Sequence, residues 1–183
     1  NQGQVYESFN MAALWDLPCL FVIENNQYGM GTAVTRAAAG PALAERGSPY
    51  GIPGKQVDGM DVLAVREAGL EALAHCREGK GPYIVEMKTY RYRGHSMSDP
   101  AKYRTREEVD AMRKQHDPID QLRELLIKQN VKEETLKAMD SQVKAVVTKA
   151  TEFAQTSPEP DPSELFTDIL LPVSVGTAAS TEA

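Results

Sequence analysis

Two polar segments of the sequence have residue types and a spacing that could carry chemistry. The first, Glu24–Gly31, follows an apolar run and places the adjacent Asn25 and Asn26 before two glycines. Amide oxygens at the end of a strand can coordinate a hard cation, and Mg²⁺ takes such oxygens together with phosphates. Asparagine and glycine are also the commonest turn residues, so an ordinary turn that closes a strand is the alternative.

The second segment, Tyr90–Pro100, follows another apolar run and contains Arg91, His95 and Ser96 within a few residues. Guanidinium and imidazole groups suit a diphosphate, and histidine transfers protons near neutral pH. A polar loop with glycine and histidine at the exit of an apolar strand is a common active-site arrangement. A solvated basic loop without a catalytic role is the alternative.

The other reactive side chains are interpreted as structural. His75 lies within an expected helix and His116 within a charged stretch, and neither follows a strand. Cys19 and Cys76 fit an apolar strand and a helix core face; two cysteines make no disulfide framework, which favours a reducing compartment. The sequence has no CxxC, HExxH, GxSxG or P-loop motif, which argues against zinc sites, metalloproteases, serine hydrolases and P-loop nucleotidases.

The amino-acid composition further narrows the class of protein. The 183 residues are 42% hydrophobic and 25% charged, which is typical of a globular domain. The net charge of −6 lacks the basic footprint of a nucleic-acid binder, and no apolar run approaches the ~20 residues of a membrane span. We therefore expect neither nucleic acid nor a membrane among the partners.

The two polar segments need a scaffold that brings strand ends together. Asp61 is expected to cap a helix that Gly79 ends. The long segment 27–54, rich in glycine and proline, is expected to be functional rather than a mere connector. Alternation of helix and strand predicts a doubly wound parallel sheet with helices on both faces, in which ligands bind beyond the carboxyl ends of strands. The expected helices are 5–17 and 61–79, and the expected strands are 19–23, 55–58 and 83–87.

The remainder predicts a helical C-terminal extension. Thr105–Glu108 has capping-box spacing, and Asp117-Pro118 is a typical helix start. A single apolar stripe of a longer helix follows, formed by Leu136, Met139, Val143, Val146, Ala150 and Phe153. The predicted organisation is an α/β part at 1–104, a helical extension at 105–156, and a proline-rich linker with a disordered tail at 157–183.

Taken together, these segments resemble the alpha subunits of pyruvate dehydrogenase, the thiamine-diphosphate-dependent decarboxylating components of 2-oxo acid dehydrogenase complexes. The resemblance runs from residue 1 to about 165 and is most specific at 89–100, which is similar to pyruvate-specific chains. It implies the thiamine-diphosphate-binding fold. The matching segments are 1–5, 10–15, 24–31, 57–61, 89–100 and 103–108.

The resemblance also implies roles for individual residues. Asn26 matches a Mg²⁺ ligand through its side-chain oxygen, and Tyr28 matches the residue that gives the metal its backbone carbonyl. His95 matches an active-site histidine near the diphosphate of the cofactor, with Arg91 in the same cofactor-binding loop. Ser96 corresponds to a serine that is phosphorylated in eukaryotic relatives. The implied cofactors are thiamine diphosphate and Mg²⁺.

The implied reaction is oxidative decarboxylation of pyruvate with transfer of the acetyl unit to a lipoyl group, on the route from glycolysis to acetyl-CoA. The implied partners are a beta subunit, in an assembly of two alpha and two beta chains, and the lipoyl domain of the dihydrolipoyl acetyltransferase. The beta subunit would supply the glutamate that activates the cofactor. Such a site is shared between chains of a multienzyme complex.

The thiamine-diphosphate motif of the family begins Gly-Asp-Gly and ends in Asn-Asn, and only the second half is in this sequence. Asp58-Gly59 follows the asparagine pair and cannot be the first half. We therefore expect a C-terminal portion that is inactive alone. An alpha chain for branched-chain 2-oxo acids or acetoin, or a non-catalytic pairing module, remains the alternative, although Met30-Gly31-Thr32 and Gly94–Met97 argue against the first.

The phosphorylation pattern bears on the source. Eukaryotic relatives use two further serines, but Ala33 takes one place and the segment Pro100–Tyr103 has no serine at the other. Together with Arg93, this indicates a bacterial chain and a cytoplasmic location, with the mitochondrial matrix as the alternative.

Overall fold

The computed structural model describes residues 2–40 and 42–169. Its centre is a parallel sheet in the order β1-β5-β4, with β1 at Leu20–Asn25, β5 at Tyr83–Lys88 and β4 at Gly54–Asp58. The register pairs Asn25 of β1 with Lys88 of β5, so these strands end side by side. The predicted strands and their parallel arrangement are confirmed.

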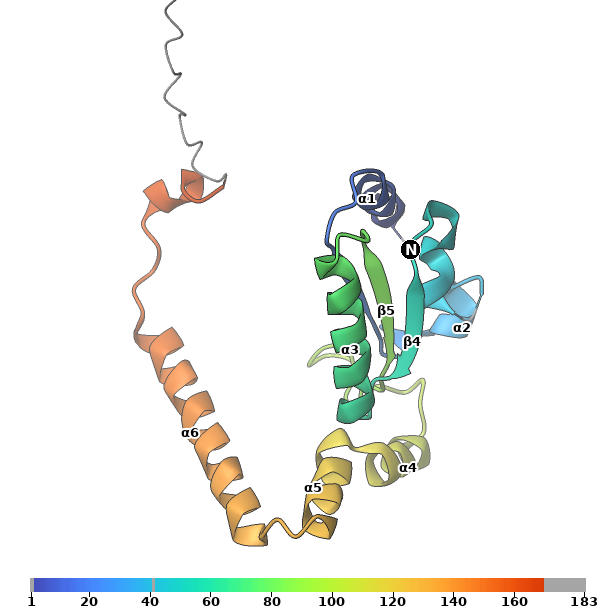
Figure 1. The fold of residues 1–183 in the computed structure, drawn as a ribbon. Helices are drawn as coiled ribbons and strands as arrows, with labels where there is room; N and C mark the ends of the chain where they lie inside the picture. Colours follow the sequence, from blue (N-terminus) through green and yellow to red (C-terminus); the bar gives the residue numbers. More distant parts are fainter. Residues whose placement is uncertain (1, 41, 170–183) are drawn as a thin grey trace, which may run out of the picture. The chain divides into compact units, whose positions relative to one another are not determined.

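One face of the sheet is covered by α3, which spans Val62–Arg77 (Figure 1). Its start is the predicted one, since the side chain of Asp61 accepts hydrogen bonds from the amides of Leu63 and Ala64. The buried positions are Ala68, Ala72 and Cys76, one on each turn. Small side chains let the helix axis approach the sheet closely, whereas the larger Val62 and Leu73 are exposed.

The opposite face is covered by α1, at Gly3–Leu14, and by the 3₁₀ helix η1, at Leu43–Tyr50 (Figure 1). Phe9 of α1 lies edge-on to Phe21 of β1, with ring centroids 4.9 Å apart. Ala44 of η1 and Ile84 of β5 complete this buried cluster. Helices on both faces confirm the predicted layers, although α1 begins and ends earlier than the expected 5–17 helix.

Strand β1 departs from one expectation. Its continuous apolar sequence predicted a strand covered on both faces, but Val22 is 53% exposed. β1 lies at an edge of the described sheet, and α3 packs against Leu20 at its start rather than along its length. The expectation that β1 is covered on both faces is therefore wrong for the described residues.

The segment 27–54 contains short elements that the sequence analysis did not predict. β2 (Tyr28–Gly29) and β3 (Thr32–Ala33) pair in an antiparallel hairpin, followed by the one-turn helix α2 (Val34–Ala37) and then η1. Met30, in the tip of this hairpin, has a left-handed backbone, φ 52°. Strands of two residues are too short to show hydrophobic periodicity, which explains why they were missed.

Two helices follow the sheet as predicted. α4 spans Arg106–His116 and is capped by Thr105, whose hydroxyl accepts from the amide of Glu108. α5 spans Pro118–Lys128 and is capped by Asp117. Both starts confirm the capping signals of the sequence.

A second compact unit begins at Lys132. It contains α6 (Glu133–Thr156) and the 3₁₀ helix η2 (Pro162–Phe166). Leu136 of the expected stripe is buried, whereas Met139, Val143 and Phe153 are exposed. The three-part division at 104 and 156 stays a prediction, and the expected disordered tail lies outside the described residues. No described helix has the length and apolar character needed to cross a membrane.

Candidate functional site

The sheet brings both polar segments to the same edge. Asn25 ends β1 and Lys88 ends β5, and these two residues are paired in the register. The amide of Thr89, the first residue after β5, donates to the carbonyl of Asn25 over 2.9 Å. The two segments therefore start from one point, as the parallel sheet predicted.

The turn after β1 is anchored by a fully buried carboxylate, Glu86 of β5. This carboxylate accepts hydrogen bonds from Asn25 Nδ2 at 2.7 Å, Gln56 Nε2 at 3.0 Å and the amide of Ala44 at 3.0 Å. Burial opposes ionisation of Glu86, but these hydrogen bonds outweigh it and hold the pKa of Glu86 below its usual range. Asn25 Oδ1 in turn accepts from the amide of Gln27, so the core fixes the path of the turn.

Asn26 and Tyr28 follow this anchor directly. Asn26 Oδ1 accepts a hydrogen bond from Thr89 Oγ1 over 2.8 Å, and both side chains are half-buried. An amide oxygen and a main-chain carbonyl are hard, neutral donors of the kind Mg²⁺ accepts. Within residues 2–40 and 42–169, no three His, Cys, Asp or Glu side chains gather as a metal cluster. The oxygen donors at this point of the described structure are therefore neutral ones.

Arg91 connects the β2–β3 hairpin to the loop after β5. Its Nη2 donates to the carbonyl of Met30 over 3.0 Å and to the hydroxyl of Tyr103 over 3.1 Å. Its Nη1 lies 3.3 Å from His95 Nδ1. The structure therefore brings Arg91 and His95 together and places them beside the hairpin that contains Tyr28.

Asp99 holds the loop around His95 in a tight fold. Its carboxylate accepts from the amides of His95 at 2.7 Å and Ala101 at 2.8 Å, and from the hydroxyl of Tyr103 at 2.8 Å. These hydrogen bonds stabilise the charged form and lower the pKa of Asp99 to about 2. Gly94 is needed here, because a Cβ at this position would lie 2.5 Å from the carbonyl oxygen of Asp99.

Arg104 is a second organiser of this loop, and the sequence analysis did not find it. It is 8% exposed, and its guanidinium lies 5.1–5.5 Å from the ring centroids of Tyr90, Tyr103 and Tyr28. It donates to the main-chain carbonyls of Arg91 and Arg93. The burial of Arg104 could hardly be predicted from the sequence, because a buried arginine does not follow the pattern of hydrophobic residues. The aromatic neighbour Tyr103 was the one local indication.

The side chains of His95 and Ser96 remain accessible. Both residues are exposed, and Ser96 Oγ lies 3.0 Å from Ser98 Oγ. The loop thus presents an imidazole and hydroxyls to solvent while its backbone is held by Asp99 and Arg104. An exposed histidine suits a site that must receive a group from another molecule.

Two cavities flank the strand ends. One, of about 540 Å³, is lined by Asn26 and Tyr28 together with apolar residues of α1 and β1. The other, of about 570 Å³, is lined by Asp58, Lys88, Thr89 and His116. The interpretation of His116 as structural rests on its following no strand in the sequence. That reason does not hold, because α4 returns His116 to the ends of β4 and β5.

The other reactive side chains lie elsewhere. His75 is in α3, as expected, with its ring 5.2 Å from the ring of Tyr83. Cys19 and Cys76 are both free, and burial raises the pKa of the Cys76 thiol. These positions are consistent with structural roles and add nothing to the site.

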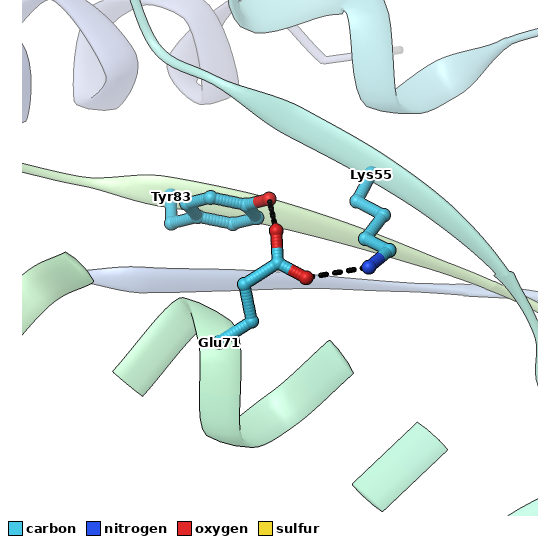
Figure 2. Close-up of polar contacts among 3 residues, drawn as sticks. All are labelled: Lys55, Glu71 and Tyr83. Carbon is cyan, nitrogen blue, oxygen red and sulfur yellow. Dashed lines mark hydrogen bonds and ion pairs between the residues drawn. The ribbon is translucent and has the colours of Figure 1, made fainter. Parts of the chain in front are cut away.

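A separate polar cluster joins Lys55 of β4, Glu71 of α3 and Tyr83 of β5 (Figure 2). Glu71 forms an ion pair with Lys55 and accepts from the hydroxyl of Tyr83 over 3.1 Å. The hydrogen bond to Lys55 lowers the pKa of Glu71, and the same contact raises the pKa of Lys55. Because Tyr83 begins β5, this cluster lies away from the strand exits and fastens α3 to the sheet.

The sequence matches the dehydrogenase E1 component family over residues 1–163. The chain belongs to this family. It is 60% identical over 172 residues to the pyruvate dehydrogenase E1 component subunit alpha of Rhizobium meliloti, covering 93% of this chain and 49% of the relative. The subunit of that name from Zymomonas mobilis is 56% identical over 171 residues, covering 93% and 48%.

A mitochondrial relative is nearly as similar. The somatic form of the pyruvate dehydrogenase E1 component subunit alpha of Homo sapiens is 53% identical over 167 residues, which is 90% of this chain and 42% of the relative. The chain thus spans about half the length of the curated relatives it matches. The family match and these identities confirm the resemblance at the level of the family. The dehydrogenase E1 family depends on thiamine diphosphate.

Proposed function

We propose that this chain is part of the alpha subunit of a pyruvate dehydrogenase E1 component and forms the Mg²⁺-diphosphate side of its thiamine diphosphate site. The observation that supports this most directly is the meeting of Asn26 and Tyr28 with Arg91 and His95 at one edge of a parallel sheet. Ligands of such sheets bind at this edge. The sheet would be part of the thiamine-diphosphate-binding fold.

Thiamine diphosphate would supply the electron sink for loss of CO₂ from pyruvate. The chain's own residues then have limited tasks. Asn26 Oδ1 and the Tyr28 carbonyl would hold Mg²⁺, and the Gly-Asp-Gly half of the family motif is absent from this sequence. The guanidinium of Arg91 would favour the diphosphate electrostatically, and His95 Nε2 would exchange a proton as the acetyl unit passes to a lipoyl group.

The remaining assignments follow from this proposal. A beta subunit would complete the site in an assembly of two alpha and two beta chains. The lipoyl domain of a dihydrolipoyl acetyltransferase would approach the exposed His95. Ser96, beside it, would be a regulatory phosphosite where a kinase is present, since phosphate adds nearly two negative charges next to a diphosphate. The bacterial cytoplasm is the proposed location, and the mitochondrial matrix is the alternative.

The substrate class is tested in the complete subunit assembled with its partner chain. Turnover of pyruvate should exceed turnover of 3-methyl-2-oxobutanoate. The opposite order would favour the branched-chain alternative. Absence of turnover with either substrate, despite assembly, would favour a non-catalytic pairing module.

The cofactor site is tested by Asn26→Ala in the same assembly. Loss of one oxygen ligand leaves the diphosphate less well neutralised, so Mg²⁺-dependent binding of thiamine diphosphate should weaken by several kcal/mol. Isothermal titration calorimetry measures this affinity. The control is Gln142→Ala, which removes an exposed amide from α6. Unchanged affinity in Asn26→Ala would restore the interpretation of an ordinary turn.

A further inference from the structure

Thr89 has no role in the function proposed above, yet it contacts both segments of the site. It is the first residue after β5, and its amide donates to the carbonyl of Asn25 over 2.9 Å. Its hydroxyl donates to Asn26 Oδ1 over 2.8 Å. A single residue therefore holds the backbone of one asparagine and the side chain of the next.

The rotamer of Thr89 is fixed by its methyl group. A Cβ at Gly59 would lie only 2.5 Å from Thr89 Cγ2, so this methyl packs directly against the Gly59 backbone. Gly59 is itself held there, because its amide donates to the carbonyl of Lys88 over 2.8 Å. Because the methyl group of Thr89 packs against Gly59, the hydroxyl group of Thr89 points toward Asn26.

An asparagine amide has an oxygen and a nitrogen in nearly equivalent positions, and only the oxygen can bind a cation. A hydroxyl can donate to Oδ1 or accept from Nδ2, and the hydrogen bond from Thr89 Oγ1 to Asn26 Oδ1 holds the amide in the first of these orientations. The oxygen has a second lone pair, which stays available for a metal ion. We propose that Thr89 is a positioning residue that fixes the amide of Asn26 with its oxygen toward the Mg²⁺ site. This inference rests on the proposed role of Asn26 as a ligand.

The test compares Thr89→Val with Thr89→Ser in the complete, assembled enzyme. Valine keeps the shape of threonine and its contact with Gly59 but removes the donor, whereas serine keeps the donor and removes the methyl group. Mg²⁺ is titrated calorimetrically at saturating thiamine diphosphate. Partners that orient metal ligands are typically worth about 10- to 100-fold in affinity, so Thr89→Val should lose about tenfold and Thr89→Ser less than about threefold.

A second pair of variants separates orientation from general packing. Asn26→Asp replaces the amide by a carboxylate whose two oxygens are equivalent, so the group no longer needs to be oriented. In this background Thr89→Val should change Mg²⁺ affinity by less than about threefold. A tenfold loss there too would show that Thr89 acts through packing and would overturn the proposal.

The remaining outcomes are distinguishable. Wild-type Mg²⁺ affinity in Thr89→Val, or equal losses in the valine and serine variants, would overturn the positioning role. If Asn26→Ala also keeps wild-type affinity, the proposed metal site itself fails. If Asn26→Ala loses affinity and Thr89→Val does not, only the role of Thr89 fails. Thermal unfolding of the metal-free protein shows that each variant is folded.

Discussion

The segments that leave β1 and β5 start side by side but are stabilised in different ways. The turn after β1 is anchored from the core, because Asn25 is 7% exposed and is held by the fully buried Glu86. The loop after β5 is held by internal polar contacts of Asp99 and Arg104 and by the contact of Arg91 with the β2–β3 hairpin, and it leaves His95 exposed.

Because of this difference, changes in the turn and changes in the loop should have different effects on the protein. A change in the anchor of the turn disturbs hydrogen bonds shared by β1, β4, β5 and η1, so it should lower the free energy of unfolding of the whole unit. A change in the loop disturbs contacts within residues 91–104 and with the β2–β3 hairpin, so it should alter local order or activity while the sheet stays folded. The predictions below test this contrast.

The largest effect is expected from His95→Ala in the assembled enzyme. General acid–base assistance is typically worth about 10²–10⁴ in rate, so acetyl transfer to a lipoyl acceptor should fall by that factor. The unfolding midpoint should hardly change, because the described contact of the imidazole is with Arg91 on the surface. Steady-state kinetics and thermal unfolding are the two measurements.

The matched control for this variant is Ser96→Ala, which truncates the neighbouring exposed side chain. It should keep activity within a few-fold of wild type. Activity of His95→Ala within the same range would contradict the catalytic role, and a lowered unfolding midpoint would contradict the contrast between turn and loop.

The next effect is on stability. Glu86→Gln keeps the shape of the side chain but turns an acceptor-only carboxylate into an amide that faces several donors. Losing charged hydrogen bonds and leaving a buried donor unpaired should lower the free energy of unfolding by about 2–4 kcal/mol. Urea unfolding measures the change.

Glu71→Gln is the control, since Glu71 belongs to the exposed cluster of Figure 2. An exposed ion pair is worth less than about 1 kcal/mol, so this variant should shift the urea midpoint only slightly. Equal shifts in the two glutamine variants would show that the buried anchor is no more important than a surface contact.

Much of the scaffold could be predicted because its signals are local. Apolar runs gave the parallel strands, and Asp61, Thr105 and Asp117 marked helix starts through caps that the structure contains. The parallel arrangement then placed Asn26 and His95 at neighbouring strand exits. These inferences depend on residues close in sequence, whose physical consequences are short-ranged.

The organisers of the site could not be predicted, because they act between segments far apart in sequence. Glu86 lies in an apolar strand and gave no sign that it would receive hydrogen bonds from Asn25, Ala44 and Gln56. Arg104 is buried against Tyr90 and Tyr103 of its own segment and against Tyr28 of the distant hairpin. The roles of Asn26, Tyr28, Arg91, His95 and Ser96 in the reaction stay predictions.

A smaller, local effect is expected from Arg104→Lys. Lysine keeps the charge but cannot donate to the carbonyls of Arg91 and Arg93 with a planar fork. Loss of such a hydrogen bond costs on the order of 1.5–3 kcal/mol of local order, so tryptic cleavage after Arg93 should become at least about tenfold faster. Mass spectrometry of timed digests identifies the cleavage site.

Arg113→Lys is the matched control, because Arg113 lies 5.0 Å from the ring of Tyr92 but is exposed on α4. It should leave cleavage after Arg93 unchanged. If Arg104→Lys lowered the urea midpoint as much as Glu86→Gln, the loop would be part of the global fold and the contrast would be lost.

The smallest effect is the titration of Asp99. Its ordinary pKa of 3.8 is lowered to about 2 by hydrogen bonds from the amides of His95 and Ala101 and from the hydroxyl of Tyr103. A carboxyl with a depressed pKa stabilises the folded loop fully above its ordinary pKa, and this contribution is lost as the pH falls from about 3.8 through about 2. The loop should therefore keep its order across the neutral range.

Amide proton chemical shifts of His95 and Ala101 measure this titration directly and should move together with a midpoint near 2. In Asp99→Asn, neither amide should titrate in this range, and cleavage after Arg93 at neutral pH should rise less than in Arg104→Lys. A midpoint near 3.8 would show that the amide contacts of Asp99 are weak. The amides of β5 are the reference. Because the described hydrogen bonds of Asp99 are all with loop residues, the β5 amides should not shift while the loop amides do. Movement of both sets with one midpoint would mean that the loop and the buried anchor unfold as one unit.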